Sequence, residues 1–436
     1  MKSPLDSNVK VNTKDKYAYW AFIYLLVFVI FSGYVEFRII WHIAILAVGI
    51  WLLVAYPKDR RKLFDKRMFI LCTILVLIMT VSTIAGHKYS EVFSNVRSMG
   101  YSLFSLFIIS IVVNRNDIMI FEMLKRRICF FNIVLIINTI VVAIQAKGTG
   151  FMIKSSWLAQ NPYYDDQVAG LFGFNATSQL GMYTIFVALL NVAYSKCEIK
   201  NKQKKKLFLI YTLILIGVMA VLSKYNDNAG YYIVLLMYTG LYLAFDTFYL
   251  TPRADKKMLK IVGYVMLAVL ALVFFLNFPA TKAVLDKYLR NRIEVMLHFQ
   301  SAGMTGSNER LYQVQYGLSQ LKCWLFGMGF GTAKLIQADA YGFLHFGICS
   351  MGGYIILLGV WFFILYTLVY SKILTQVAVY KSGRKVIGIT SYIVMLLFTM
   401  YISIYNDARS VILIGLYSVI FRYMAYKKEN KEVNRL

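Results

Sequence analysis

Long apolar blocks, each close to twenty residues, alternate along this chain with short charged stretches. A helix of about 20 residues crosses the ~30 Å of hydrocarbon in a bilayer, so blocks of this length are typical of transmembrane helices. The composition agrees, because 59% of the 436 residues are hydrophobic and only 16% are charged, whereas soluble chains carry about 25% charged residues. We therefore predict an all-α integral membrane protein and exclude a soluble globular or disordered chain.

Twelve apolar blocks are candidates for transmembrane helices. They occupy residues 17–33, 39–56, 68–85, 99–113, 128–146, 178–195, 207–222, 230–250, 259–278, 350–371, 386–405 and 409–426. This reading divides the chain into three parts. Residues 1–278 hold nine spans and an outer loop at 147–177, residues 279–349 form a large outer loop, and residues 350–436 hold three spans and a cytoplasmic tail.

The basic residues are divided unequally between the two sides that this topology defines. Lys and Arg outnumber Asp and Glu by 47 to 21, which gives a net charge of +26. An even number of spans puts both ends of the chain on one side, and the segments on that side hold 33 of the 47 basic residues. Basic residues favour the cytoplasmic side. We therefore predict cytoplasmic termini and outward-facing long loops, and the basic excess requires no nucleic acid partner.

The two outer loops are longer than simple connections require, and loops of this length are usually functional or disordered. In the second loop, residues 282–299 repeat apolar side chains at helical spacing, which predicts an amphipathic helix at the membrane surface. A second helix is predicted to begin after Ser307. It would place Arg310 in its first turn, where the helix dipole does not favour a cation. Arg310 is therefore either a functional residue that uses its charge to bind a ligand, or a solvated surface arginine.

Glycine alternates with larger residues in the stretch Trp-Leu-Phe-Gly-Met-Gly-Phe-Gly at 324–331. Gly329 and Gly331 would let the backbone approach a ligand closely, and the alternative is a tight turn packed on the helical bundle. The spacing differs from a dinucleotide fingerprint, and motifs for nucleotide hydrolysis or metalloprotease chemistry are missing from the sequence. We therefore predict neither a metal site nor a cofactor.

Three sequence features occur in a fixed order along the chain. Gly-Leu-Phe-Gly-Phe-Asn at 170–175 leads into a span, Arg310 lies on a helix before the glycine-rich stretch, and Asp339 and Phe346-Gly347 precede the next span. Together they resemble the O-antigen polymerase and O-antigen ligase superfamily. The expected twelve spans and the dominant outer loop agree with the family, and the resemblance covers roughly residues 165–370.

The resemblance implies glycosyl transfer at the outer face of a bacterial cytoplasmic membrane. The donor would be a growing glycan on a polyprenyl diphosphate, and the acceptor would be another lipid-linked repeat unit. The product would be a capsular, exo- or O-antigen polysaccharide. The partners implied are the lipid bilayer, a chain-length regulator and a flippase, with no metal or nucleotide cofactor.

The resemblance also assigns candidate site residues. Catalytic roles fall to Arg310, to Arg292, which precedes Gly303 with a spacing common in family polymerases, and to Asp339 as the base. Glu309, Glu294 and His298 are alternative bases. The implied substrate-binding residues are Arg290, Lys224, Lys334, Asn175, Gly329 and Gly331. Lys224 stands where the family has an arginine, and its ammonium group is a point charge that cannot form the paired hydrogen bonds of a guanidinium.

Two alternatives remain for the function. Ligases of the superfamily carry a His-Asn pair near the position of Asp339, and its absence here favours the polymerase. A transporter or flippase of lipid-linked oligosaccharide would show charged or broken helices at mid-membrane depth. The predicted spans are nearly free of charge, which also favours the polymerase.

Overall fold

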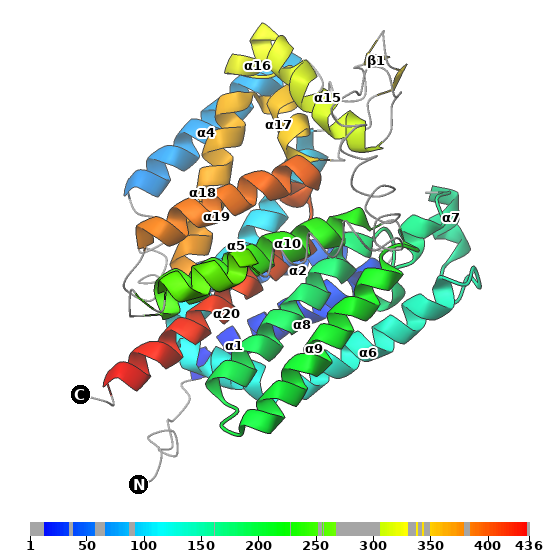
Figure 1. Ribbon diagram of the computed structural model, residues 1–436. Helices are drawn as coiled ribbons and strands as arrows, with labels where there is room; N and C mark the ends of the chain where they lie inside the picture. The colour runs from blue at the N-terminus through cyan, green and yellow to red at the C-terminus, as the bar shows by residue number, and fades with distance from the viewer. Residues whose placement is uncertain are drawn as a thin grey trace.

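The computed structural model describes most of the chain, and nearly all of the described part is helical (Figure 1). It describes residues 13–34, 38–56, 66–86, 92–160, 162–226, 228–251, 255, 257–266, 306–329, 337–338, 342–343, 349–378 and 384–433. Within these ranges the strands are β1 (Gln337–Ala338) and β2 (Gly342–Phe343), which pair antiparallel.

Eight helices of the described part are long and apolar enough to cross a membrane. They are α4 (Lys66–Gly86), the Val96–Arg115 part of α5 (Val92–Arg126), α6 (Ile128–Gln145), α8 (Thr177–Cys197), α9 (Lys202–Leu222), α10 (Ala229–Ala244) with the π-helix η6 (Phe245–Leu250), α18 (Val360–Ala378) and α20 (Ala408–Val433). Shorter apolar helices are α1 (Thr13–Phe31) with the turn η2 (Ser32–Tyr34), α2 (Arg38–Ala55) and α19 (Arg384–Tyr401). The prediction of an all-α, multi-span membrane chain is confirmed, while the count of twelve spans stays a prediction.

Two of the predicted boundaries differ from the structure. The span expected at 99–113 is the middle of α5, which continues to Arg126 through a segment expected to be a connection. That segment contains neither Pro nor Gly, so its polar residues do not end the helix. The span expected at 350–371 is broken at Gly359 into α17 (Ser350–Leu358) and α18. The span expected at 259–278 lies mostly outside the described residues, of which 257–266 are helical.

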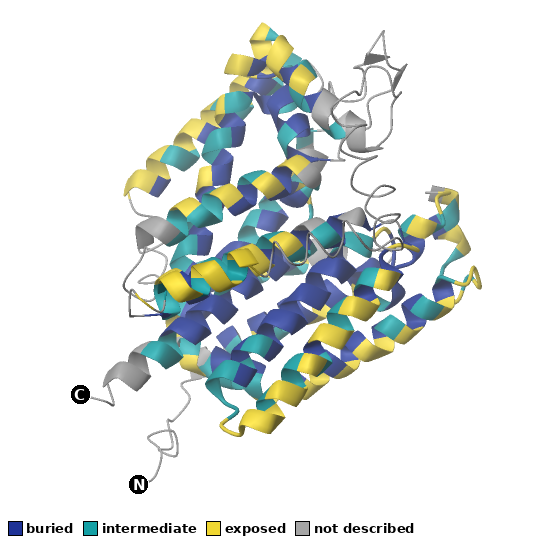
Figure 2. Cartoon of the chain, in the orientation of Figure 1, coloured by how far each residue is buried: buried dark blue, intermediate teal, exposed yellow. Residues whose placement is uncertain are grey.

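The interior of the bundle is built around α20. This helix packs against α1, α5, α8 and α18, and 94% of its membrane-length window is buried, against 17% for α4 and for α9. Figure 2 shows the same contrast, with α20 mostly dark blue and the outward side of α9 yellow. The apolar residues of α4 and α9 therefore face the surroundings, where lipid would cover them, and those of α20 form the core.

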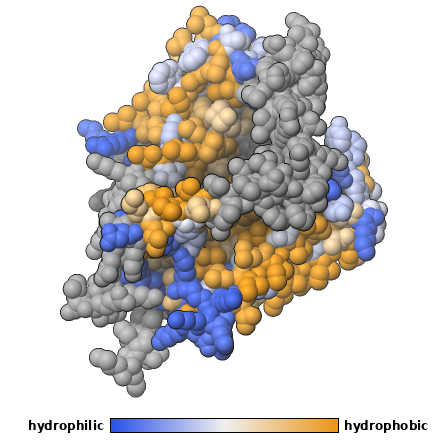
Figure 3. Space-filling model, viewed as in Figure 1, coloured by the Kyte–Doolittle hydropathy of each residue, from blue (hydrophilic) through white to orange (hydrophobic). Residues whose placement is uncertain are grey.

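Charged side chains from distant segments gather at one end of the bundle, which we call the basic end. There Glu198, directly after α8, lies 2.8 Å from Lys427 of α20 and 3.5 Å from Lys125 of α5. Asp246 of η6 lies 2.6 Å from Lys196 of α8. Figure 3 shows hydrophilic surface where α8 meets α9, beside the apolar surface of the bundle. The loop 147–177 and the helix α15 (Gly306–Ser319) lie at the opposite end, which we call the loop end (Figure 1).

Candidate functional site at the loop end

One part of the loop 147–177, residues 167–174, folds back into the bundle, while much of the rest of the loop lies at the surface. The loop contains α7 (Ser155–Gln160) and two short turns, η4 (Asp165–Gln167) and η5 (Gly170–Phe172). Val168, Ala169 and Phe172 are fully buried. Irregular backbone at membrane depth is tolerated only where its N–H and C=O groups find hydrogen-bond partners in the protein. The buried part of this loop therefore needs polar partners within the bundle.

Polar side chains of the bundle provide those partners. The Gln145 side-chain oxygen accepts a hydrogen bond from the Gly170 amide at 2.8 Å, and the Asn226 amide donates to the Val168 carbonyl at 3.0 Å. The Tyr34 hydroxyl donates to the Gly170 carbonyl at 2.6 Å. These contacts come from η2, α6 and the turn after α9, so three separated parts of the chain hold the segment in place.

The Gly-Leu-Phe-Gly-Phe-Asn pattern has a direct conformational reason. Gly170, Gly173 and Asn175 all have positive φ, at 62°, 78° and 46°. Glycine adopts such angles without penalty, and asparagine is among the residues that tolerate them. A Cβ on Gly173 would lie 2.7 Å from the Gly33 carbonyl carbon. Asn175, for which the resemblance implies a substrate-binding role, is exposed and accepts a 2.7 Å hydrogen bond from Gln167.

An acid–arginine pair lies directly behind this segment, at the start of α20. The carboxylate of Asp407 accepts from the backbone amides of Arg409 at 3.2 Å and Ser410 at 3.3 Å, and therefore caps the helix. The Gln179 amide and the Ser410 hydroxyl also donate to it. The Arg409 guanidinium lies 3.4 Å from Asp407, and its Nη1 lies 3.5 Å from the carbonyl oxygen of Phe172.

Both members of the pair are shielded from bulk solvent and charged. The side chain of Arg409 is 13% exposed and that of Asp407 is 22% exposed. Burial alone would raise the pKa of the Asp407 carboxyl, but the Arg409 charge and the hydrogen bonds from Ser410 and Gln179 outweigh burial and lower that pKa. Both contacts of the guanidinium with described residues are long, and a guanidinium carries five N–H donors. Arg409 therefore keeps donor capacity toward an anion.

The helix that carries Arg310 joins the same end of the bundle. This helix is α15, and it begins at Gly306, one residue before Ser307, after which the sequence predicts a helix. This helix packs against α17, and α17 packs against the turn η9 (Ile404–Asn406) that leads to Asp407. The Tyr354 hydroxyl of α17 donates to the Asn406 side chain at 2.7 Å. Arg310 is half-buried.

The glycine-rich stretch packs on protein backbone at the break between α17 and α18. It begins inside the short helix α16 (Leu321–Leu325), and the structure describes it as far as Gly329. The Gly329 amide donates to the Leu357 carbonyl at 3.0 Å, and a Cβ on Gly329 would lie 2.4 Å from the Gly86 Cα. Gly327 and Gly329 have φ of 75° and 96°. These contacts account for glycine at both positions without a ligand.

Of the remaining predicted site residues, Lys224 is exposed in the turn after α9, two residues before Asn226. That turn contacts the buried loop segment, so Lys224 and Asn175 belong to one region. The other predicted site residues lie outside the described part of the chain. They are Arg290, Arg292, Gly331, Lys334 and Asp339.

The sequence reasoning missed Asp407, Arg409 and Gln179. A usable signal existed, because the sequence places Asp407 and Arg409 where two apolar blocks meet with almost no connecting turn. Arg409 lies inside the predicted span 409–426, and charged residues inside spans are rare and usually functional. The described residues bring together no group of three or more His, Cys, Asp or Glu side chains that would hold a metal.

Comparisons with protein-family models, with curated proteins and with solved structures found no match to this chain.

Proposed function

We propose that this chain polymerises lipid-linked oligosaccharide repeat units by glycosyl transfer from a polyprenyl diphosphate-linked glycan. The observation that carries the proposal is the position of the 170–175 segment, which resembles a polymerase motif, directly in front of Arg409. A partly buried arginine with spare donors suits the binding of a diphosphate, because charge-assisted hydrogen bonds are strongest to such anions. The lysine and arginine distribution supports an outward-facing loop end.

In the proposed reaction, the acceptor sugar hydroxyl attacks the anomeric carbon of the donor glycan. The bond from that carbon to the diphosphate oxygen breaks as the new glycosidic bond forms, and the polyprenyl diphosphate departs. The acceptor proton passes to a carboxylate, for which Asp339 is the candidate. Arg310 and Arg409 would stabilise the charge that develops on the departing diphosphate, with Arg292, Arg290, Lys334 and Lys224 as further cations.

The test compares arginine variants at the two ends of the bundle. Arg409→Ala and Arg310→Ala should each slow chain growth about 10–150-fold, the effect of losing a charged hydrogen bond of about 1.5–3 kcal/mol. Arg409→Lys should restore part of the activity. Arg126→Ala is the matched control, because Arg126 is 80% exposed and lies at the basic end.

The measurement is the length distribution of lipid-linked glycan made by purified protein in vesicles. Ordinary chain length for both arginine variants at equal protein level would refute the proposed role of the loop end. Transfer of finished glycan to a different acceptor, without chain growth, would support the ligase instead.

A transporter of lipid-linked oligosaccharide is the second candidate, and the break at Gly359 favours it. Discontinuous helices in transporters frequently line the substrate path. Here a Cβ on Gly359 would lie 2.9 Å from the Leu325 carbonyl oxygen, so protein backbone occupies the space beside the break. Movement of lipid-linked oligosaccharide across vesicle membranes without change in glycan length would favour this candidate over the polymerase.

A further inference from the structure

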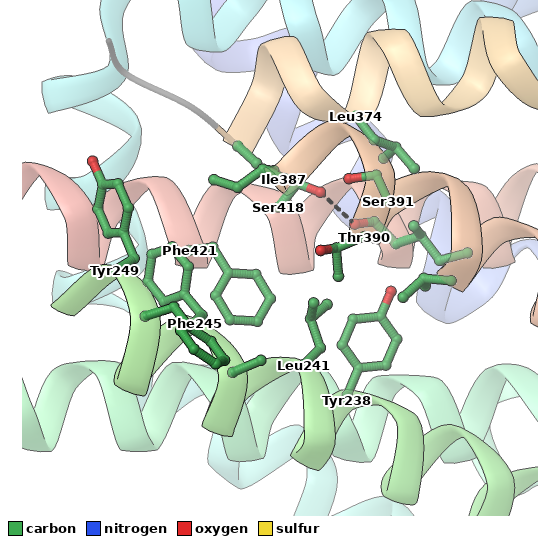
Figure 4. Close-up of a pocket in the computed structure, with 15 residues that line it drawn as sticks. Tyr238, Leu241, Phe245, Tyr249, Leu374, Ile387, Thr390, Ser391, Ser418 and Phe421 are labelled. Carbon is green, nitrogen blue, oxygen red and sulfur yellow. Dashed lines mark hydrogen bonds between the residues drawn. The ribbon is translucent and has the colours of Figure 1, made fainter. Parts of the chain in front are cut away.

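We propose that a cavity near the basic end binds an acyl chain of an anionic phospholipid from the adjacent leaflet. The cavity measures about 180 Å³ and lies between α10, η6, α18, α19 and α20 (Figure 4). It lies apart from the loop end, so the inference is independent of the proposed glycan chemistry.

The walls of the cavity match a hydrocarbon chain. They are formed largely by aromatic and aliphatic side chains, among them Tyr238, Leu241, Phe245, Leu374 and Phe421. The polar groups of the wall are a few hydroxyls, including those of Ser391 and Ser418, which Figure 4 shows among the apolar side chains. Apolar cavities of about 150 Å³ stay dry and accept apolar molecules, so a cavity with these walls favours a hydrocarbon over water.

The cavity reaches the surface that lipid would cover. Phe248 lines the cavity and is 62% exposed. It belongs to Gly230–Leu250, one of the candidate membrane spans. A lipid tail would therefore enter from the side, through the hydrocarbon layer.

Ammonium groups lie beside η6, the segment that forms part of this wall. Asp246 of η6 lies 2.6 Å from Lys196 and 2.5 Å from Lys260, so two ammonium groups share one carboxylate. The Lys428 ammonium donates to the carbonyl of Tyr249, a lining residue, at 2.6 Å and lies 5.3 Å from its ring centroid. Lys196, Lys260 and Lys428 thus flank η6, and basic pockets between transmembrane helices on the cytoplasmic side bind anionic lipid head groups.

The backbone of this wall is also unusual. Residues 245–250 form a π-helix, and such segments are rare and frequently mark functional sites. Phe245, Phe248 and Tyr249 of this segment line the cavity, and its Asp246 and Tyr249 contact the neighbouring ammonium groups.

The experiment uses the full chain in vesicles that contain phosphatidylglycerol with a photoreactive group in one acyl chain. Crosslinks should map to residues 238–250 and 387–421, and unlabelled phosphatidylglycerol should displace the probe better than phosphatidylcholine does. Ser391→Trp, which fills the cavity, should reduce crosslinking about tenfold, equivalent to about 1.4 kcal/mol. Lys428→Gln should reduce crosslinking of the phosphatidylglycerol probe and leave a phosphatidylcholine probe unchanged.

Matched controls separate the cavity from general lipid contact. Ile393→Trp lies on the same helix at a 50% exposed position and should retain crosslinking. Lys204→Gln changes an exposed lysine of α9 and should also retain it. Equal competition by the two lipids, crosslinks elsewhere, or displacement by polyprenyl phosphate alone would overturn the proposal. The competition arm needs no variant, so misfolding of Ser391→Trp would leave the proposal testable.

Discussion

At the scale of single residues, Asp407 joins two roles that are usually separate. Its carboxylate caps α20 through two backbone amides and also faces the Arg409 guanidinium. Since asparagine caps helices about as well as aspartate, Asp407→Asn keeps one capping oxygen and removes the charge. It also replaces the second oxygen by an NH2 group, to which the Gln179 amide cannot donate, so only the part of its effect that depends on pH reports on the ion pair.

We expect Asp407→Asn to lower stability at neutral pH and to have less effect in acid. The pKa of Asp407 is lowered in the folded protein, below the unfolded value of about 3.9. Its ionised form therefore stabilises the fold fully above that unfolded value, and the contribution is lost as the pH falls through the folded pKa. Thermal unfolding in detergent between about pH 3 and pH 7 should show two midpoints that converge in acid.

Asp165→Asn is the control for this experiment, because Asp165 is an exposed carboxylate of the same loop region. Its unfolding midpoint should follow the unmodified protein across the pH range. A constant difference between the midpoints of Asp407→Asn and the unmodified protein at every pH would contradict the assigned ion pair.

At the scale of residues, a sequence pattern can be explained where it has a local cause. The pattern at 170–175 has one, because Gly170, Gly173 and Asn175 all have positive φ, while its likeness to a polymerase motif stays a prediction. The pair Asp407 and Arg409 was missed, because the sequence does not show that their turn meets a loop more than two hundred residues earlier. Contacts of that range depend on how the helices pack.

At the scale of elements, the break between α17 and α18 is the largest departure from the predicted organisation. A glycine in an apolar run gives no signal for a break, because helices in membranes tolerate glycine. The break depends on Gly359, whose φ of 92° and ψ of 164° are accessible essentially to glycine alone. The backbone of the glycine-rich stretch packs beside it.

We therefore expect Gly359→Ala to destabilise the protein by about 1–3 kcal/mol, the cost of a residue held in such a region. Gly353→Ala is the matched control, six residues earlier inside α17, with no atom within 4 Å of the added Cβ. Alanine in a helix interior should be neutral or stabilising by about 0.5–1 kcal/mol. Thermal unfolding of the two variants gives the comparison, and equal midpoints would argue against a conformational role for Gly359.

At the scale of the whole molecule, the class of fold was predictable because membrane thickness fixes helix length. The apolar blocks located most of the helices to within a few residues. Depth within the bundle was not predictable, since α4, α9 and α20 are all apolar and only α20 is enclosed. Without water outside the spans, hydropathy does not distinguish a lipid-facing helix from a buried one.

The proposed orientation gives a prediction for the whole molecule. Single cysteines at the exposed positions Thr149 and Lys204 should respond differently to an impermeant thiol reagent, on a background without native cysteines. In intact cells the cysteine at 149 should be labelled, and the one at 204 should be labelled only after permeabilisation. The reverse pattern would overturn the orientation and the outer-face reaction together.

The position of α20 in the chain has a consequence for biogenesis. Its packing partners α1, α5, α8 and α18 all precede it, so they leave the ribosome before the helix that they enclose. Until α20 inserts, their inward faces have only lipid or one another to contact, and Asp407 cannot yet meet Gln179. The core around α20, and with it the contact between Gln179 and Asp407 behind the loop-end site, is therefore completed only after α1, α5, α8 and α18 have been synthesised.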